Sequence, residues 1–250
     1  MKKYIVLLTA AVLALQINPA LAQFGGSPGD FKFGGALKKV FGDNSAFTAM
    51  LSAEVKPKTG DAIVLPGKVA FDDGKARFEI NMSSAMGSKL PAGAAEQMKA
   101  MGLDQMTTIA LPDKKVLYLI YPNLQSYVEN PMPDAGSGTN ENYKVATTEL
   151  GKATVDGHPC VENKVVVTDD KGKASEFTVW NATDLKNFPV KIVHAEKDTE
   201  ITMSFKDISM TKPAASSFAP PTGYTRYDSM QGMIQAVMMK KMAGGLGAPK

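Results

Sequence analysis

The chain has 250 residues, of which 44% are hydrophobic and 21% charged, and its formal net charge at pH 7 is +3. This balance argues against a nucleic-acid-binding protein, which would carry a basic stripe. The single cysteine, Cys160, cannot form a disulfide within the chain. Stability must therefore come from a buried core, and a chain of this length can build a sizeable one.

The first residues predict export. Two lysines precede an apolar run from Tyr4 to Leu15, and the small-residue site Ala20-Leu21-Ala22 follows. This order is typical of a secretory signal peptide, and the run is shorter than the roughly 20 residues that a membrane anchor needs. We expect residues 1–22 to be removed after Ala22, which leaves a periplasmic or otherwise exported chain without a transmembrane anchor. Residues 23–46 are expected to form a flexible lead-in with a short helix.

Apolar and polar residues alternate from Phe47 onwards, which predicts strands with one covered face. "FTAMLSAEV" places Phe47, Leu51 and Val55 on one face, and "KARFEINM" repeats the arrangement. Asp73-Gly74 lies between two apolar runs and predicts a hairpin. Pro66-Gly67 predicts a break or bulge in the strand between them. The turns together predict a meander of antiparallel strands.

Two segments predict helices. Residues 91–102 have a proline in the first turn and a glycine at the end. The second helix lies in residues 227–250, a methionine-rich segment whose end after Gly244 is expected to be disordered. One broad apolar face of this helix gathers Met230, Met233, Ile234, Val237 and Met238.

No motif in the chain predicts catalysis. His158 and His194 lie in no pattern that pairs them with a nucleophile or a metal, and no phosphate loop or dinucleotide fingerprint is present. His158-Pro-Cys160 supplies too few ligands for a closed zinc site. We therefore expect a protein that is not an enzyme and has no cofactor. The fifteen methionines leave one metal alternative open, a thioether copper(I) site in the C-terminal helix.

The order of motifs in the second half of the chain resembles a known family. A glycine-rich entry leads to a strand ending in Val-Trp, then a polar loop, a strand that opens with Phe-Pro, and a final Phe-x-x-Pro-x-Gly-Tyr. The residues are Gly151, Val155, Gly157, Cys160, Val179, Trp180, Phe188, Pro189, Val190, Lys191, Ile192, Phe218, Pro221, Gly223 and Tyr224. This order resembles the LolA-like proteins, the periplasmic lipoprotein carriers and their relatives, and most closely an uncharacterised exported branch of them.

The resemblance implies a mainly β (α+β) fold over residues 47–226. The expected architecture is an open, curved antiparallel half-barrel of about ten strands with a few helices as a lid. In that family the concave face holds acyl chains, so a lipid, a lipoprotein acyl chain or another apolar ligand is the expected partner. The residues expected to line this face are Phe47, Leu51, Phe71, Phe78, Ile80, Met82, Tyr118, Ile120, Val179, Ile192, Met203 and Phe205.

The resemblance also raises the question of what covers this face. The carriers have an arginine that ties the lid to the barrel, and Arg77-Phe78 is the nearest match here, in reversed order. Arg77 and the apolar side chains of the C-terminal helix are therefore the lid candidates, and the same helix is a candidate docking element for an envelope protein. Two alternatives to ligand binding remain: the copper(I) site, and a structural envelope protein whose cavity is filled by its own side chains.

Overall fold

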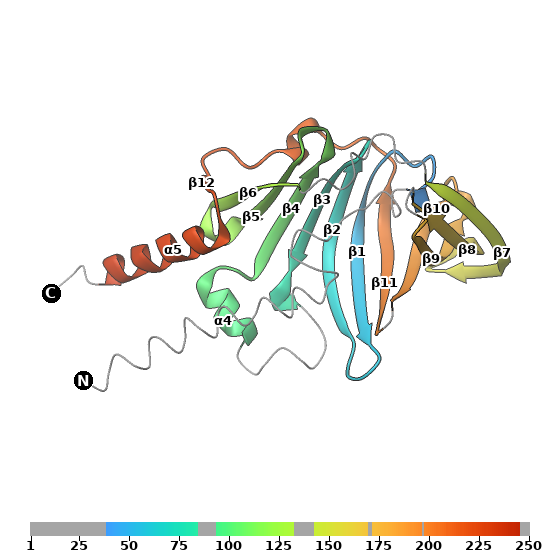
Figure 1. Ribbon diagram of the computed structural model, residues 1–250, viewed down its shortest axis with the longest axis horizontal. Helices are drawn as coiled ribbons and strands as arrows, with labels where there is room; N and C mark the ends of the chain where they lie inside the picture. The colour runs from blue at the N-terminus through green and yellow to red at the C-terminus, as the bar shows by residue number, and fades with distance from the viewer. Residues whose placement is uncertain (1–38, 85–93, 133–142, 170–171, 197, 246–250) are drawn as a thin grey trace. The chain divides into compact units, whose positions relative to one another are not determined.

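The computed structural model describes residues 39–84, 94–132, 143–169, 172–196 and 198–245 (Figure 1). The expected signal peptide, most of the lead-in and the last five residues lie outside these ranges. The strands are β1 (Ala46–Pro57), β2 (Ile63–Asp72), β3 (Lys75–Asn81), β4 (Gln105–Leu111), β5 (Val116–Tyr121), β6 (Ser126–Pro131), β7 (Lys144–Val155), β8 (His158–Thr168), β9 (Ala174–Ala182), β10 (Phe188–Glu196), β11 (Thr199–Ser209) and β12 (Thr225–Tyr227).

All twelve strands belong to one curved sheet in the order β12-β6-β5-β4-β3-β2-β1-β11-β10-β9-β8-β7. Neighbours are antiparallel except β12 and β6, which pair in parallel. The two ends of the sheet, β12 and β7, do not pair with each other, so the sheet is open. The predicted mainly β fold with an open antiparallel sheet is confirmed, with twelve strands in place of about ten.

In the part of the chain that the structure describes, two longer helices accompany the sheet, α4 (Ala94–Met101) and α5 (Met230–Gly245). Short 3₁₀ segments also occur: η1 (Met82–Ser84), η2 (Pro112–Lys114), η3 (Pro122–Leu124), η4 (Thr183–Leu185) and η5 (Ala215–Phe218). No helix in the described ranges combines the length and the apolar character needed to cross a membrane.

Local sequence explains the first hairpins. Asp72 pairs with Lys75, so Asp73 and Gly74 form a two-residue turn, and both have positive φ, as a type I′ turn requires. The expected break at Pro66-Gly67 is wrong, because β2 continues through both residues in register with β1. Gly67 is needed there for space, because a Cβ at this position would clash with the backbone carbonyl oxygen of Glu79.

The register divides the side chains between two faces of the sheet. We call the inner face the side that carries Phe47 of β1, which pairs with Phe71, and Phe78 of β3, which pairs with Val69. The outer face is the opposite side, where Arg77 of β3 pairs with Ile109 of β4. Residues paired across two strands have their side chains on the same face, and successive side chains along a strand point to opposite faces. The pairs above therefore assign each remaining paired residue to the inner or the outer face.

One end of the inner face is filled by aromatic rings. Phe41, in the turn before β1, lies 5.0 Å from Phe47 and 5.6 Å from both Phe188 and Phe205, measured between ring centroids. Phe71 completes this aromatic cluster, 5.5 Å from Phe47. All five side chains are at most 2% exposed. Offset and edge-to-face contacts at these distances are typical of a packed core.

Part of the outer face, over β2, β4 and β5, is covered by residues 211–224, which we call the strap. Its η5 turn places Phe218 in an apolar cluster with Ala70, Ile109, Leu111 and Ile120, and Tyr118, Tyr127 and Tyr224 pack around it. The strap thereby crosses the outer face on its way from β11 to β12, at the far side of β6.

Polar contacts fasten the strap at two points. Arg77 donates from Nη1 to the carbonyl oxygen of Ser217 (3.0 Å) and from Nε to Glu79 (2.8 Å). The buried carboxylate of Asp72 pairs with Lys75 (3.1 Å) and with Lys212 of the strap (3.3 Å). Burial alone would raise the pKa of Asp72, but the hydrogen bonds and charges of the two lysines outweigh it and hold the pKa below its usual value.

We predict that Phe218→Ala lowers the free energy of unfolding by about 3–5 kcal/mol, because it removes the largest buried side chain of the strap and leaves a cavity. Urea denaturation followed by circular dichroism measures the change. Ser216→Ala, at an exposed position of the same turn, is the matched control and should change stability by less than about 0.5 kcal/mol. Equal effects of the two substitutions would contradict the role of Phe218.

Candidate apolar-ligand site

The expected lining residues do not all share one face. The inner face carries Phe47, Leu51, Phe71, Phe78, Ile80, Val179, Ile192, Met203 and Phe205, and Met82 is buried in η1, directly after β3. Tyr118 and Ile120 lie on the outer face, because Tyr118 pairs with Ile109 and Ile120 with Thr107. Their expected place on the concave face is therefore wrong, and both pack against the strap instead.

The same register places Arg77 on the outer face. Its side chain joins β3 to the strap, on the side of the sheet opposite Phe78. The resemblance predicted that Arg77 contacts a lid on the concave face. In the structure Arg77 instead donates a hydrogen bond to the strap on the outer face.

A second apolar region of the inner face lies over β4, β5 and β6, and sequence patterns did not single it out. Its centre is Leu117, Leu119 and Tyr121 of β5, Val128 of β6, and Met233 of α5. The partly buried neighbours are Leu103, Met106, Ala110, Leu124, Met132, Tyr227 and Met230. We call the whole group the methionine cluster, after Met106, Met132, Met230 and Met233.

The methionine cluster is covered by the start of α5. Ser229 caps the helix, since the N–H of Gly232 donates to its Oγ (3.1 Å). Met233 is fully buried, whereas Met238 and Met239 are 38% and 64% exposed. Of the remaining lid candidates, Met230, Ile234 and Val237 are half-buried. Only the first turns of α5 therefore contact the sheet closely, and the helix leads away from the β6 end (Figure 1).

The chemistry of the methionine cluster is neutral. None of its members carries a charge. The Tyr121 hydroxyl donates to Sδ of Met106 (3.7 Å), and burial raises the pKa of Tyr121 well above its usual range. Methionine side chains are unbranched and adapt to irregular shapes. Such a surface suits a flexible apolar chain and offers nothing to a charged group.

The outer face has a recess of a different kind. It encloses about 420 Å³ beside the strap, and its walls include Lys68, Arg77, Glu79 and Asp207. These four charged side chains stand beside apolar ones such as Met50 and Ala70, so the lining is partly charged and partly apolar. An apolar ligand in this recess would lie next to charged groups, which the methionine cluster lacks.

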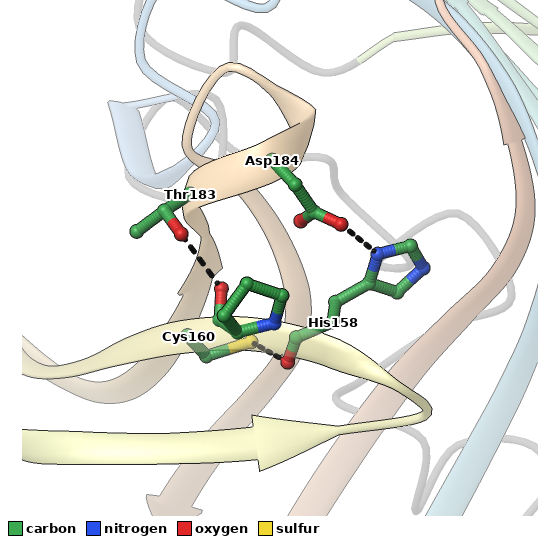
Figure 2. Close-up of polar contacts among 5 residues, drawn as sticks. His158, Cys160, Thr183 and Asp184 are labelled. Carbon is green, nitrogen blue, oxygen red and sulfur yellow. Dashed lines mark hydrogen bonds and ion pairs between the residues drawn. The ribbon is translucent and has the colours of Figure 1, made fainter.

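His158 and Asp184 form the most suggestive polar pair of the described chain, shown in Figure 2. Nδ1 of His158 lies 2.8 Å from the Asp184 carboxylate. Cys160 is buried, and its thiol donates to the backbone carbonyl of His158 (3.3 Å), away from the imidazole ring. Burial raises the pKa of the Cys160 thiol, which disfavours the reactive thiolate.

This arrangement is structural. The side chains on β8 and η4 hold the turn to the strand, and Thr183 adds a hydrogen bond to the carbonyl oxygen of Pro159 (3.1 Å). The imidazole and the thiol do not form a base and nucleophile pair. Among the described residues, no three His, Cys, Asp or Glu side chains group as metal ligands.

Similarity to solved structures occurs at low sequence identity. Lipoprotein LppX from Mycobacterium tuberculosis matches with a TM-score of 0.42 and 11% identity, over 72% of this chain and 93% of that one. A LolA superfamily protein from Nitrosomonas europaea matches with a TM-score of 0.37 and 9% identity, over 74% and 94%. LprF from Mycobacterium bovis matches with a TM-score of 0.36 and 11% identity, over 72% and 94%.

No protein-family model and no curated protein matches the chain. A LolA superfamily protein is among the solved structures to which this chain is similar. TM-scores below 0.5 do not assign a ligand or a partner to this chain. The fold is therefore described from its strand order and register, and the candidate site from the side chains that form it.

We predict that Met233→Ala lowers the free energy of unfolding by about 2–5 kcal/mol, because its side chain is fully enclosed between α5 and the sheet. Met239→Ala, on the exposed part of the same helix, is the control and should stay within about 0.5 kcal/mol of the unsubstituted protein. Chemical denaturation of both variants makes the comparison. A neutral Met233→Ala would mean that α5 does not pack on the cluster in solution.

Proposed function

We propose that the protein is an exported, non-enzymatic carrier that binds a lipid, a lipoprotein acyl chain or a similar apolar ligand. The seat is the methionine cluster on the inner face, and the start of α5 is its cover. The sequence features that support export are the N-terminal lysines, the apolar run and the small-residue site before Gln23.

One observation carries the proposal: the inner face has two apolar regions, and they differ in how they are covered. The aromatic cluster is closed by rigid rings that pack against one another and come from distant parts of the chain, such as Phe41 before β1 and Phe205 in β11. The methionine cluster is closed by one turn of a terminal helix, through Met230 and Met233. A single helical turn that contributes flexible side chains can shift to admit a ligand with the loss of few contacts.

The ligand class follows from the side chains. An acyl chain needs apolar, conformationally adaptable surroundings, and the cluster offers leucine, valine and methionine without a charge. A charged headgroup would lose its hydration in the cluster without gaining an ion pair, so it has to stay outside. The exposed Met238 and Met239 on the outer part of α5 support the further proposal that this helix docks on an envelope protein.

Direct binding of a fluorescent fatty acid tests the proposal. Met230→Glu places a charge at the edge of the seat and should weaken binding by about tenfold or more, because one large apolar contact is worth roughly 1.5–3 kcal/mol. Met239→Glu makes the same chemical change on the exposed part of the helix and should leave the affinity unchanged. An external probe is needed, because the only tryptophan, Trp180, lies on the outer face beside Lys191 (4.6 Å).

The outcomes separate the possibilities. Loss in Met230→Glu alone supports the seat under α5. Equal loss in both variants would point to non-specific adsorption to the helix. No binding by the unsubstituted protein would favour the remaining alternative, a structural envelope protein whose cavity is filled by its own side chains.

A copper(I) site is the second candidate, and one observation favours it. Met106, Met132, Met230 and Met233, from three parts of the chain, pack in one cluster, and thioethers are ligands that copper(I) accepts. Competition with a copper(I) chelator tests this candidate on the same protein. Met106→Leu keeps the apolar volume and removes a sulfur, so it should abolish copper binding and spare fatty-acid binding if copper is the ligand.

A further inference from the structure

β7 is an open edge of the sheet. It pairs along its length with β8, and it is the last strand in the order. Nine of its twelve residues are exposed, and they include residues of both faces. Two large apolar side chains on this strand, Val145 and Leu150, are 46% and 54% exposed. A long strand with an unpaired row of N–H and C=O groups is a template for another strand.

The other edge of the sheet is protected. β12 has three residues, and α5 begins three residues after it ends. Short edge strands and neighbouring helices are ordinary means of blocking further pairing. Within the described ranges, β7 is therefore the edge that can accept a further strand.

A bulge at Leu150 restricts how β7 can pair. Glu149 lies opposite Asn163 and Gly151 opposite Glu162, so Leu150 is an extra residue with no partner on β8. Before the bulge, odd-numbered residues such as Thr147 lie on the inner face, and after it even-numbered residues such as Lys152 do. Where residues before the bulge meet residues after it on the same strand of a second copy, each face is matched only when the two residues have opposite parity.

We propose that β7 pairs antiparallel with β7 of a second copy of this chain, with Leu150 opposite Gly151 of the partner. This two-fold arrangement joins the two sheets edge to edge. It sets Glu149 opposite Lys152, Thr147 opposite Thr154, and Ala146 opposite Val155, each pair occurring twice and each on one face.

Charge selects this register. Glu149 and Lys152 are exposed, and neither makes an ion pair or a side-chain hydrogen bond within the part of the chain that the structure describes. In the proposed register they form two cross-strand ion pairs. Moving the partner by two residues sets Thr147 opposite Lys152, or Glu149 opposite Thr154, and both charge pairs are lost. Opposite charges directly across a ladder stabilise it, and like charges destabilise it.

A charge exchange tests the interface. Sedimentation analysis over a concentration series should show the purified protein in a monomer and dimer equilibrium. Glu149→Lys alone and Lys152→Glu alone should each weaken dimerisation by tenfold or more, because each brings two like-charged pairs together. The double variant, Glu149→Lys with Lys152→Glu, should restore it. A protein that stays monomeric throughout, or a double variant as weak as the single ones, would overturn the proposal.

Cysteine pairs test the register in a Cys160→Ala background. Thr147→Cys with Thr154→Cys should yield a disulfide-linked dimer on oxidation, because the two positions meet across the two-fold axis. They cannot bond within one chain, since seven residues of extended strand span about 23 Å. Thr147→Cys with Lys152→Cys is the control that would cross-link in the neighbouring register. Preferential cross-linking of the control would reject the proposed pairing.

Discussion

The architecture depends on one constraint: an open sheet with apolar side chains on both faces must be covered twice. β5 shows this most clearly, because Leu117 and Leu119 face inward while Tyr118 and Ile120 face outward. Leaving such side chains in water costs roughly 25 cal/mol for each Å² of apolar surface. The chain uses separate segments for the two tasks, the turn at Phe41 and helix α5 on the inner face and the strap on the outer.

Much of the sheet could be predicted because β1 and β3 carry polar residues on one face. The alternation of apolar and polar residues therefore identifies the buried side of "FTAMLSAEV" and "KARFEINM". β5 carries no such signal. "VLYLIY" is apolar at every position, so its register could not be assigned without knowing that Phe218, about a hundred residues later, covers one side. For the same reason, Leu117 and Leu119 were not identified as inner-face residues, and the contact of Arg77 with the strap was not predicted. Phe41 was missed because its ring partners come from four different strands, of which only β1 is close to it in the sequence.

The face of most expected lining residues could be predicted, with Tyr118 and Ile120 as the exceptions, whereas their role in binding a ligand stays a prediction. Most of the expected residues line the inner face, but several of them form the aromatic cluster, where they fill one another's space. The region that we propose as the ligand seat lies under α5, and of the sequence-derived candidates only Met230 and Met233 belong to it. The apolar residues of a sequence indicate which face of a sheet is buried. They do not indicate whether the segment that covers this face can move to admit a ligand.

Methionine methyl groups report most directly on the proposed seat. The protein can be labelled with ¹³C-methyl methionine and its spectrum recorded during titration with a fatty acid. The account predicts large shifts for Met106, Met132, Met230 and Met233, and none for Met50, which lies exposed on the outer face, or for Met239 at the exposed end of α5. Saturable binding that shifts Met50 or Met239 and leaves the methionine cluster unchanged would contradict a ligand seat beneath α5.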